Sequence, residues 1–327
     1  MKSIRYKVMF IVLSVMLTAC TSQEDRQIER QARLEAQLTK QAQLAEMQLN
    51  SLKNHINSGM VKNIPILKLY GETVKQAKPE FAQLVDALTK DATPNGPTYL
   101  SLEFRLNDVK INIPRAAIIG ESASNKIKRE MVLIEEAATP ALYNMILTDP
   151  INVLADMSDG KLARVEAMSK EAMKATGGAT EPHQGSQLVG NPSYGHWQNN
   201  NNGQVWMWLA AYSMFSNLHR PVYYNNWSTG RHYSYYHDVG RSHYTSPSQY
   251  KQQQTSQSTA RAKFQKQGKA FTSPYAKTRA GATSTTVRPK SSNRSSNFKS
   301  SYSSSNSSLS SVRNTSSRTS RGRSGGK

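Results

Sequence analysis

The sequence has a single cysteine, Cys20, and this scarcity excludes a disulfide scaffold. Long apolar runs are equally scarce, because only one stands in the chain, near the amino terminus, and a polytopic membrane protein is therefore excluded. The chain also lacks the Gly-x-x-x-x-Gly-Lys, His-Glu-x-x-His, Gly-x-Ser-x-Gly and Cys-x-x-Cys motifs. With these common signatures of enzymes missing, the sequence predicts no catalytic residue and no cofactor, and it favours a protein without enzymatic activity.

Acidic residues are missing from the last quarter of the chain. Residues 245–327 contain 16 Lys and Arg and no Asp or Glu, in a chain whose formal net charge is +20. Because Lys2, Arg5 and Lys7 supply most of the remaining charge, the region between the two ends is close to neutral. This distribution excludes a uniformly basic nucleic-acid-binding domain, and we predict no specific nucleic acid as a partner.

The amino terminus has the layout of an export signal. Three cationic residues precede an apolar run over residues 8–17, which is shorter than the ~20 residues that cross a bilayer. Small residues follow, and the tetrad Leu17-Thr18-Ala19-Cys20 resembles the lipobox of bacterial lipoproteins. An ordinary secretory signal with a chance cysteine is the alternative interpretation.

The lipobox resemblance implies a location. In bacterial lipoproteins the signal peptide, here residues 1–19, is cleaved after the residue that matches Ala19, and the cysteine that matches Cys20 carries lipid on its sulfur and its new amino group. Membrane lipid is then a partner, and several acyl chains make the anchoring effectively permanent. An Asp after the cysteine tends to retain such proteins in the inner membrane, so Thr21 implies the outer membrane of the envelope. The resemblance covers residues 1–21 and says nothing of the rest.

Residues 20–60 are predicted to form a helical stalk behind the lipidated cysteine. The stretch from 22 to 58 lacks Pro and Gly and is rich in helix-forming residues, and Gly59 provides a stop. Apolar residues recur at alternating spacings of four and three: Leu38, Ala42, Ala45, Leu49, Leu52 and Ile56. Such a stripe fits a coiled coil that makes a homo-oligomer through residues 34–56, or an amphipathic helix that lies on the downstream domain.

Residues 61–178 are predicted to form a small α+β domain, and α+β is the fold class that we expect for the protein. A helix face follows Pro79, and alternating apolar residues over 100–105 and 109–113 predict a β-hairpin whose turn is Asn107-Asp108. Residues 123–148 are predicted to be helical with a break at Pro140, and residues 161–175 to form a further helix.

Residues 179–244 form an aromatic-rich segment that also contains six of the seven histidines. All four tryptophans lie in it: Trp197, Trp206, Trp208 and Trp227. Residues 205–218 are consistent with a short apolar helix. Three interpretations remain open: the aromatic side chains pack over the preceding domain, they form a surface that stacks on sugars or a partner protein, or the segment is of low complexity and self-associates.

Four residues of this segment are candidate metal ligands, namely His232, His237, Asp238 and His243. Imidazoles with one carboxylate suit zinc or copper, and such a site would make the protein an envelope enzyme or a metal-binding protein that uses residues 196–243. The spacing matches no established ligand pattern, and compositional bias explains the cluster more simply.

Residues 245–327 are predicted to be a disordered tail, because they contain too few large apolar residues to offset the entropy of ordering. One interpretation of the tail is a solvated linker. The other is electrostatic capture of an envelope polyanion, a long-range, salt-sensitive attraction. Taken together, the sequence predicts a lipid-anchored envelope protein that tethers an anionic or glycan component, or a partner protein.

Overall fold

The computed structural model describes residues 2–165, 184–201, 203–218, 220–231, 233–271 and 273–275. The longer helices of the first half are α1 (Lys2–Asn57), α2 (Asn63–Ala77), α3 (Ala82–Thr89), α4 (Pro97–Ile119), α5 (Glu121–Ala137), α6 (Pro140–Ile146) and α7 (Thr148–Met157). The second half contains strands β1 (Gly195–Asn200) and β2 (Gly203–Trp208), helices α9 (Met214–Leu218), α10 (Tyr224–Gly230), α11 (Arg241–Tyr244) and α12 (Pro247–Lys266), and the π-helical turn η4 (Tyr236–Gly240). The fold is therefore mostly helical with one small sheet, which supports the predicted α+β class only loosely.

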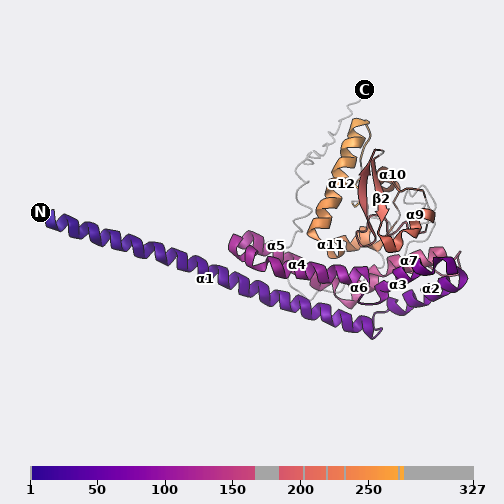
Figure 1. Cartoon of the computed structure of the whole chain (residues 1–327), viewed down its shortest axis with the longest axis horizontal. Coiled ribbons are helices and arrows are strands. Elements are labelled where there is room, and N and C mark those ends of the chain that lie inside the picture. The colour runs from indigo at the N-terminus through magenta and orange to yellow at the C-terminus, as the bar shows by residue number, and fades with distance from the viewer. Residues whose placement is uncertain are drawn as a thin grey trace, which may run out of the picture. The chain divides into compact units, whose positions relative to one another are not determined.

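The predicted apolar stripe of α1 is buried within the chain. Its six residues are at most 3% exposed, and α1 packs against both α4 and α5, as Figure 1 shows for the carboxyl-terminal half of the helix. Of the two interpretations of the stripe, the structure shows the helix lying on the downstream domain. The homo-oligomer predicted through residues 34–56 stays a prediction, but its apolar contacts are already occupied.

The part of α1 that precedes Leu38 differs from the stripe, because none of its described side chains is buried. Residues 23–30 are all exposed, Ile28 among them at 59%, and the first buried residue is Leu38. The helix thus continues well beyond the part that packs on other helices. Within the ranges that the structure describes, no helix combines the length and the apolar character needed to cross a membrane.

Several predicted helix boundaries are confirmed. Gly59 ends α1 with φ of +69°, a left-handed conformation that favours glycine, and its N–H donates to the carbonyl of Ile56. The predicted break at Pro140 separates α5 from α6, where the side chain of Thr139 caps the new helix by accepting from the N–H of Leu142. Local chemistry therefore determines where these helices begin and end.

The predicted β-hairpin over residues 100–113 is wrong, because these residues belong to α4. The same sequence also carries a helical period, and its members are all buried: Tyr99, Leu102, Leu106, Val109, Ile113 and Ala116. The alternating pattern is incidental, since Phe104 and Ile111 are 70% and 78% exposed. The helical period prevails because it places one continuous apolar face against α1 and α5.

The predicted helix over residues 205–218 is only partly correct. Residues 203–208 are strand β2, which pairs antiparallel with β1 so that Trp197 stands opposite Trp206. Short helical turns follow at Ala210–Tyr212 and Met214–Leu218. The helix predicted over 161–175 is wrong for residues 161–165, which are bends and irregular structure, and its remainder lies outside the described residues.

The predicted disordered tail begins too early in the sequence. Residues 247–266 form helix α12, which starts with a complete capping box between Ser246 and Gln249 and has Pro247 in its first turn. The buried residues of α12 are small or polar, Gln253, Ser256 and Ala260, so the helix does not depend on a large apolar face. Residues 276–327 lie outside the described part of the chain.

One apolar core joins the regions that the sequence divides. It extends from Leu38 of α1 through α2–α7 to Tyr194, Phe215 and Tyr235 of the aromatic-rich segment. A second, smaller core gathers Trp206, Tyr224 and Trp227 with Ala260 of α12. The predicted borders at residues 60, 178 and 244 are therefore not borders between separate cores.

Candidate functional site

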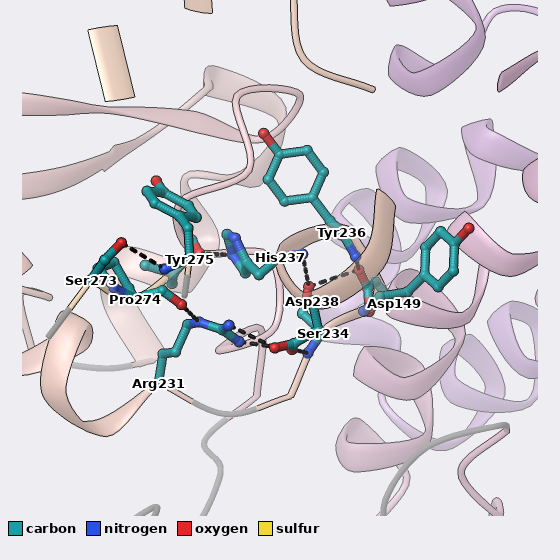
Figure 2. Close-up of polar contacts among 11 residues, drawn as sticks. Asp149, Arg231, Ser234, Tyr236, His237, Asp238, Ser273, Pro274 and Tyr275 are labelled. Atoms are coloured by element: carbon teal, nitrogen blue, oxygen red, sulfur yellow. Dashed lines mark hydrogen bonds and ion pairs between the residues drawn. The ribbon is translucent and has the colours of Figure 1, made fainter. Parts of the chain in front are cut away.

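Asp149 holds the aromatic-rich segment on the helices. This carboxylate of α7 is 2% exposed and accepts hydrogen bonds from the backbone N–H groups of Tyr235 and Tyr236, at 2.9 and 3.0 Å, and from the hydroxyl of Ser234, at 2.9 Å (Figure 2). Burial raises the pKa of Asp149 to about 6, although these hydrogen bonds oppose the shift. The group is structural, because its oxygens are fully used by the segment that leads into η4.

A buried ion pair closes the other side of η4. The guanidinium of Arg231 donates two hydrogen bonds to the carboxylate of Asp238, at 2.7 and 2.8 Å, and both side chains are 1% exposed. Figure 2 shows the same guanidinium reaching the carbonyl of Pro274, to which its Nε donates at 2.6 Å. A bidentate ion pair of this kind fixes the orientation of both side chains. Together with the bond to Pro274, it holds residues 273–275 against Arg231 and Asp238.

The side chain of His237 is buried. One ring nitrogen lies 2.8 Å from the carbonyl of Val189, and the ring packs edge-on against Trp227 and Tyr236. Burial first, and the nearby Arg231 second, hold the pKa of His237 well below its ordinary value. The imidazole is therefore neutral at physiological pH, and Nε2–H donates to Val189.

The candidate metal ligands have separate partners. Asp238 pairs with Arg231 and His237 with the carbonyl of Val189, while Nε2 of His243 lies 3.0 Å from Glu136. His232 falls outside the described residues. Among the residues that the structure does describe, no group of three or more His, Cys, Asp or Glu could hold a metal ion. The sequence grouped these residues by proximity in the chain, and in the structure the three described ones each have a different partner.

The four tryptophans, by contrast, are brought together. Ring centroids are 5.1 Å apart for Trp197 and Trp206, 5.8 Å for Trp206 and Trp208, and 5.2 Å for Trp197 and Trp227. Trp206 and Trp227 are buried, and the other two are partly buried. The aromatic side chains thus pack with one another, and this contact stabilises the region beyond the area that each ring buries.

A groove opens between the β-hairpin and α12. Its volume is about 640 Å³, and one wall is the hairpin face that carries Trp197, Asn199, Gln204 and Trp206. The other wall is α12, from Ser248 to Ser256. Composition singles out both tryptophans but predicts no facing wall, because it indicates disorder for residues 245–266. The capping box at Ser246 was the available signal.

Three residues that line this groove carry a fully buried polar atom without a hydrogen-bond partner in the described structure. They are Trp197 and Trp206, through Nε1, and Gln204, through Oε1. Buried polar groups are nearly always paired, by protein or by water, but eight other buried side-chain atoms of the described residues lack a partner too, so these orphans do not by themselves distinguish the groove. Gly195 matters here, since a Cβ at that position would lie 2.6 Å from the Trp206 ring and 2.4 Å from the carbonyl of Met207.

A second cleft, of about 660 Å³, lies between α4 and the start of α12. Phe104 and Leu209 line it with exposed apolar surface, and the buried ion pair of Arg105 and Glu130, at 2.7 Å, is in its wall. The guanidinium of Arg105 also donates to the carbonyl of His243, so the pair is engaged in holding α11 on α4 and α5. The cleft therefore offers apolar contact, and Nη2 of Arg105 in its lining is a buried atom without a hydrogen-bond partner, although it lies within ion-pair distance of Glu130.

Comparison with protein-family models, with curated proteins and with solved structures gives no match for this chain. The functional interpretation consequently depends on the residues and their geometry.

Proposed function

We propose that the protein is a lipid-anchored component of the bacterial envelope that tethers an anionic envelope polymer. The observation that carries the tethering is the one-sided charge of residues 245–327, with 16 cationic residues and no acid. Lipopolysaccharide phosphates, teichoic acids, acidic capsule and extracellular DNA are the polyanions that such a stretch attracts in an envelope. Binding of this kind is insensitive to sequence and weakens with salt.

The anchor in this proposal is Cys20, acylated after cleavage behind Ala19, with the outer membrane as its location. The exposed part of α1 supports a stalk: Leu38, the first buried residue after the exposed residues 23–30, is 18 positions beyond Cys20, which in a straight helix is about 27 Å at ~1.5 Å per residue. A folded body that begins at Leu38 would therefore stand clear of the lipid headgroups.

Helix α12 supports the tether from the folded side. Lys251, Lys263, Lys266 and Lys269 are exposed on α12 and just after it, so the cationic stretch starts on the folded body. Five of the 16 cationic residues lie in residues 245–275, and eleven lie in residues 276–327. No observation favours the alternative of an enzyme or a metal-binding protein over residues 196–243, because the described candidate residues there already have structural partners.

The test is capture of a polyanion by membrane-bound protein. Full-length chain in phospholipid vesicles is mixed with fluorescent polyphosphate and sedimented at 50 mM and 500 mM salt, beside a chain that ends at residue 275. We expect the wild type to co-sediment polyphosphate at low salt, with at least tenfold less at high salt and an intermediate amount for the shortened chain. Equal capture by the two chains, or capture that does not depend on salt, would contradict the proposal.

A further inference from the structure

Helix α4 carries an apolar face that no described element covers. One side of the helix packs on α1 and α5, and the other carries four large apolar side chains that are 64–78% exposed: Phe104, Ile111, Ile118 and Ile119. Phe104, Ile111 and Ile118 are seven residues apart, a spacing that brings side chains to nearly the same side of a helix. Apolar side chains that gather on one exposed face, rather than scattering singly, are typical of an interaction surface.

The segments outside the described structure contain little that could cover this face. Residues 166–183 contain two large apolar residues, Met168 and Met173. Residues 276–327 contain five aliphatic or aromatic residues larger than Ala: Val287, Phe298, Tyr302, Leu309 and Val312. A helix face with this many isoleucines packs best on another apolar helix face, and α4 of a second copy provides one.

Two opposite charges on the face match a second copy in one orientation. Asp108 and Arg115 are both exposed, three residues before and four residues after Ile111. If two α4 helices lie antiparallel about a twofold axis at Ile111, Phe104 stands opposite Ile118 of the second copy, and Asp108 of each copy stands within one residue of the position opposite Arg115. A parallel pair would bring like charges together, so the charges select the antiparallel pair.

The two ends of the face also complement each other. At the amino-terminal end, Phe104 borders the cleft of about 660 Å³, whose lining includes Leu100 and Leu209. At the other end, Ile118 and Ile119 are the last residues of the helix and are 67% and 64% exposed. The antiparallel pair places these isoleucines of each copy beside Phe104 of the other, at the edge of its cleft. A surface that matches itself in this way fits a twofold interface.

We propose that the exposed face of α4 binds α4 of a second copy and forms an antiparallel homodimer whose twofold axis passes at Ile111. The apolar side chains drive the association, and two Asp108–Arg115 pairs in each dimer set its orientation. From Phe104 to Ile118 the contact is about 21 Å long, so its area is modest and we expect association in the micromolar range.

This dimer differs from the oligomer predicted through residues 34–56, whose apolar stripe is buried within the chain. It also goes beyond the proposed function and does not depend on it, because every residue in the contact belongs to α4 or to the cleft beside it. If the proposed function holds, one dimer carries two anchors and two cationic stretches, and a polymer that contacts both stretches is held more tightly than by one.

A matched pair of aspartate substitutions tests the apolar contact. Ile111→Asp places a charge at the twofold axis, whereas Leu69→Asp makes the same kind of change at a side chain of α2 that is 63% exposed. Light scattering measures the mass of the full-length chain in a mild non-ionic detergent, from ~1 to ~100 µM, a range that brackets micromolar dissociation constants. We expect the wild type and Leu69→Asp to become dimeric over this range and Ile111→Asp to stay monomeric.

Unchanged thermal unfolding of both variants is the folding control, since both positions are exposed. A wild type that stays monomeric, or equal effects of the two substitutions, would overturn the proposal. A chain that ends at residue 275 and dimerises while the full-length chain does not would show that residues 276–327 cover the face in place of a second copy, and this result would overturn it too.

An exchange of charges tests the orientation. Asp108→Arg and Arg115→Asp each place like charges together in the antiparallel pair, so each should weaken dimerisation about tenfold, because two ion pairs change in every dimer. The double variant brings opposite charges together again, and its dissociation constant should return to within about threefold of the wild-type value. Single variants that dimerise as the wild type does, or a double variant that is no tighter than the single ones, would contradict the antiparallel dimer.

Discussion

At the scale of single residues, Asp149 shows how a buried carboxylate can organise the start of a short helical turn. It replaces missing backbone partners for the N–H groups of Tyr235 and Tyr236. Because burial favours the protonated form of Asp149, the contribution of this side chain to the free energy of unfolding depends on pH. Ser234, through its hydroxyl, is the third group that this carboxylate binds.

We predict that the stabilising effect of Asp149 decreases as the pH rises. Its pKa is about 6 in the folded protein against an ordinary 3.8, so the folded state holds the proton more tightly than the unfolded chain. The free energy of unfolding of the wild type, minus that of Asp149→Asn, should therefore fall by about 2 kcal/mol between pH 4 and pH 7, at ~1.4 kcal/mol per pKa unit, because the carboxyl of the unfolded chain is already partly ionised at pH 4. Urea unfolding at four pH values measures this difference, and a difference that is constant or grows with pH would contradict the assignment.

The same scale explains why the sequence identified Trp197 and Trp206 but missed the partner of Asp238. Aromatic residues concentrated in one segment predict close packing wherever the chain folds, since each has a large area to bury. A carboxylate near histidines predicts a ligand only if nothing else pairs with it. Here Arg231, seven residues earlier, takes both oxygens of Asp238, and no local pattern in the sequence indicates that pairing.

At the scale of elements, the stripe on α1 and the helix α4 depend on each other. The stripe predicted correctly that α1 has one apolar face, but the partner of that face was misread as a hairpin. Residues 99–116 satisfy two periods at once, and the burial offered by α1 and α5 decides between them. Whether residues 99–116 form a helix or a hairpin depends on their contacts with α1 and α5, so the sequence of this segment alone could not decide it.

A pair of leucines on α1 tests this packing. Leu52 is fully buried and Leu44 is 47% exposed on the same helix. Leu52→Ala should lower the free energy of unfolding by about 2–5 kcal/mol through lost contacts and a cavity, and Leu44→Ala by less than about 1 kcal/mol. Sedimentation velocity on the same samples shows whether either change alters the oligomeric state. A drop in molecular mass with Leu52→Ala would instead favour the coiled-coil interpretation of the stripe.

Two truncations test the role of α12. This helix contacts α10 and covers the smaller core through Ala260, and Gln253 bonds to the hydroxyl of Tyr236 at 2.8 Å. A chain that ends at residue 244 should therefore lose at least ~10 °C in Tm, because Trp206 and Trp227 become exposed. A chain that ends at residue 275 should keep the Tm of the full-length protein, as measured by thermal unfolding. Similar values for the two truncations would show that α12 adds little to the fold.

At the scale of the whole molecule, composition predicted the distribution of charge but placed one border wrongly. Few large apolar residues occur after residue 245, yet residues 247–266 form a helix with a specific cap and a narrow buried side of small and polar residues. Composition measures how much surface a segment can bury, whereas α12 relies on aromatic rings that other segments provide. The described structure therefore extends about thirty residues past the predicted border, to residue 275.

The account of the whole molecule combines a lipid anchor, a helical stalk, a folded body with an amide-lined groove and a cationic stretch. Anchor and cationic stretch lie at opposite ends of the sequence, so a polymer held by one is joined to the membrane by the other. In the proposed function, Cys20→Ser removes the anchor, and ending the chain at residue 275 weakens the capture of the polymer because only five of the 16 cationic residues remain.

The measurement that tests the central claim most directly is the mass of the amino-terminal peptide of the protein recovered from bacterial membranes. Mass spectrometry of the wild type should find a peptide that begins at Cys20 and carries the added mass of acyl chains, and Cys20→Ser should abolish both the modification and the membrane association. A wild-type peptide that begins at Met1 with an unmodified Cys20, recovered from the soluble fraction, would contradict the account.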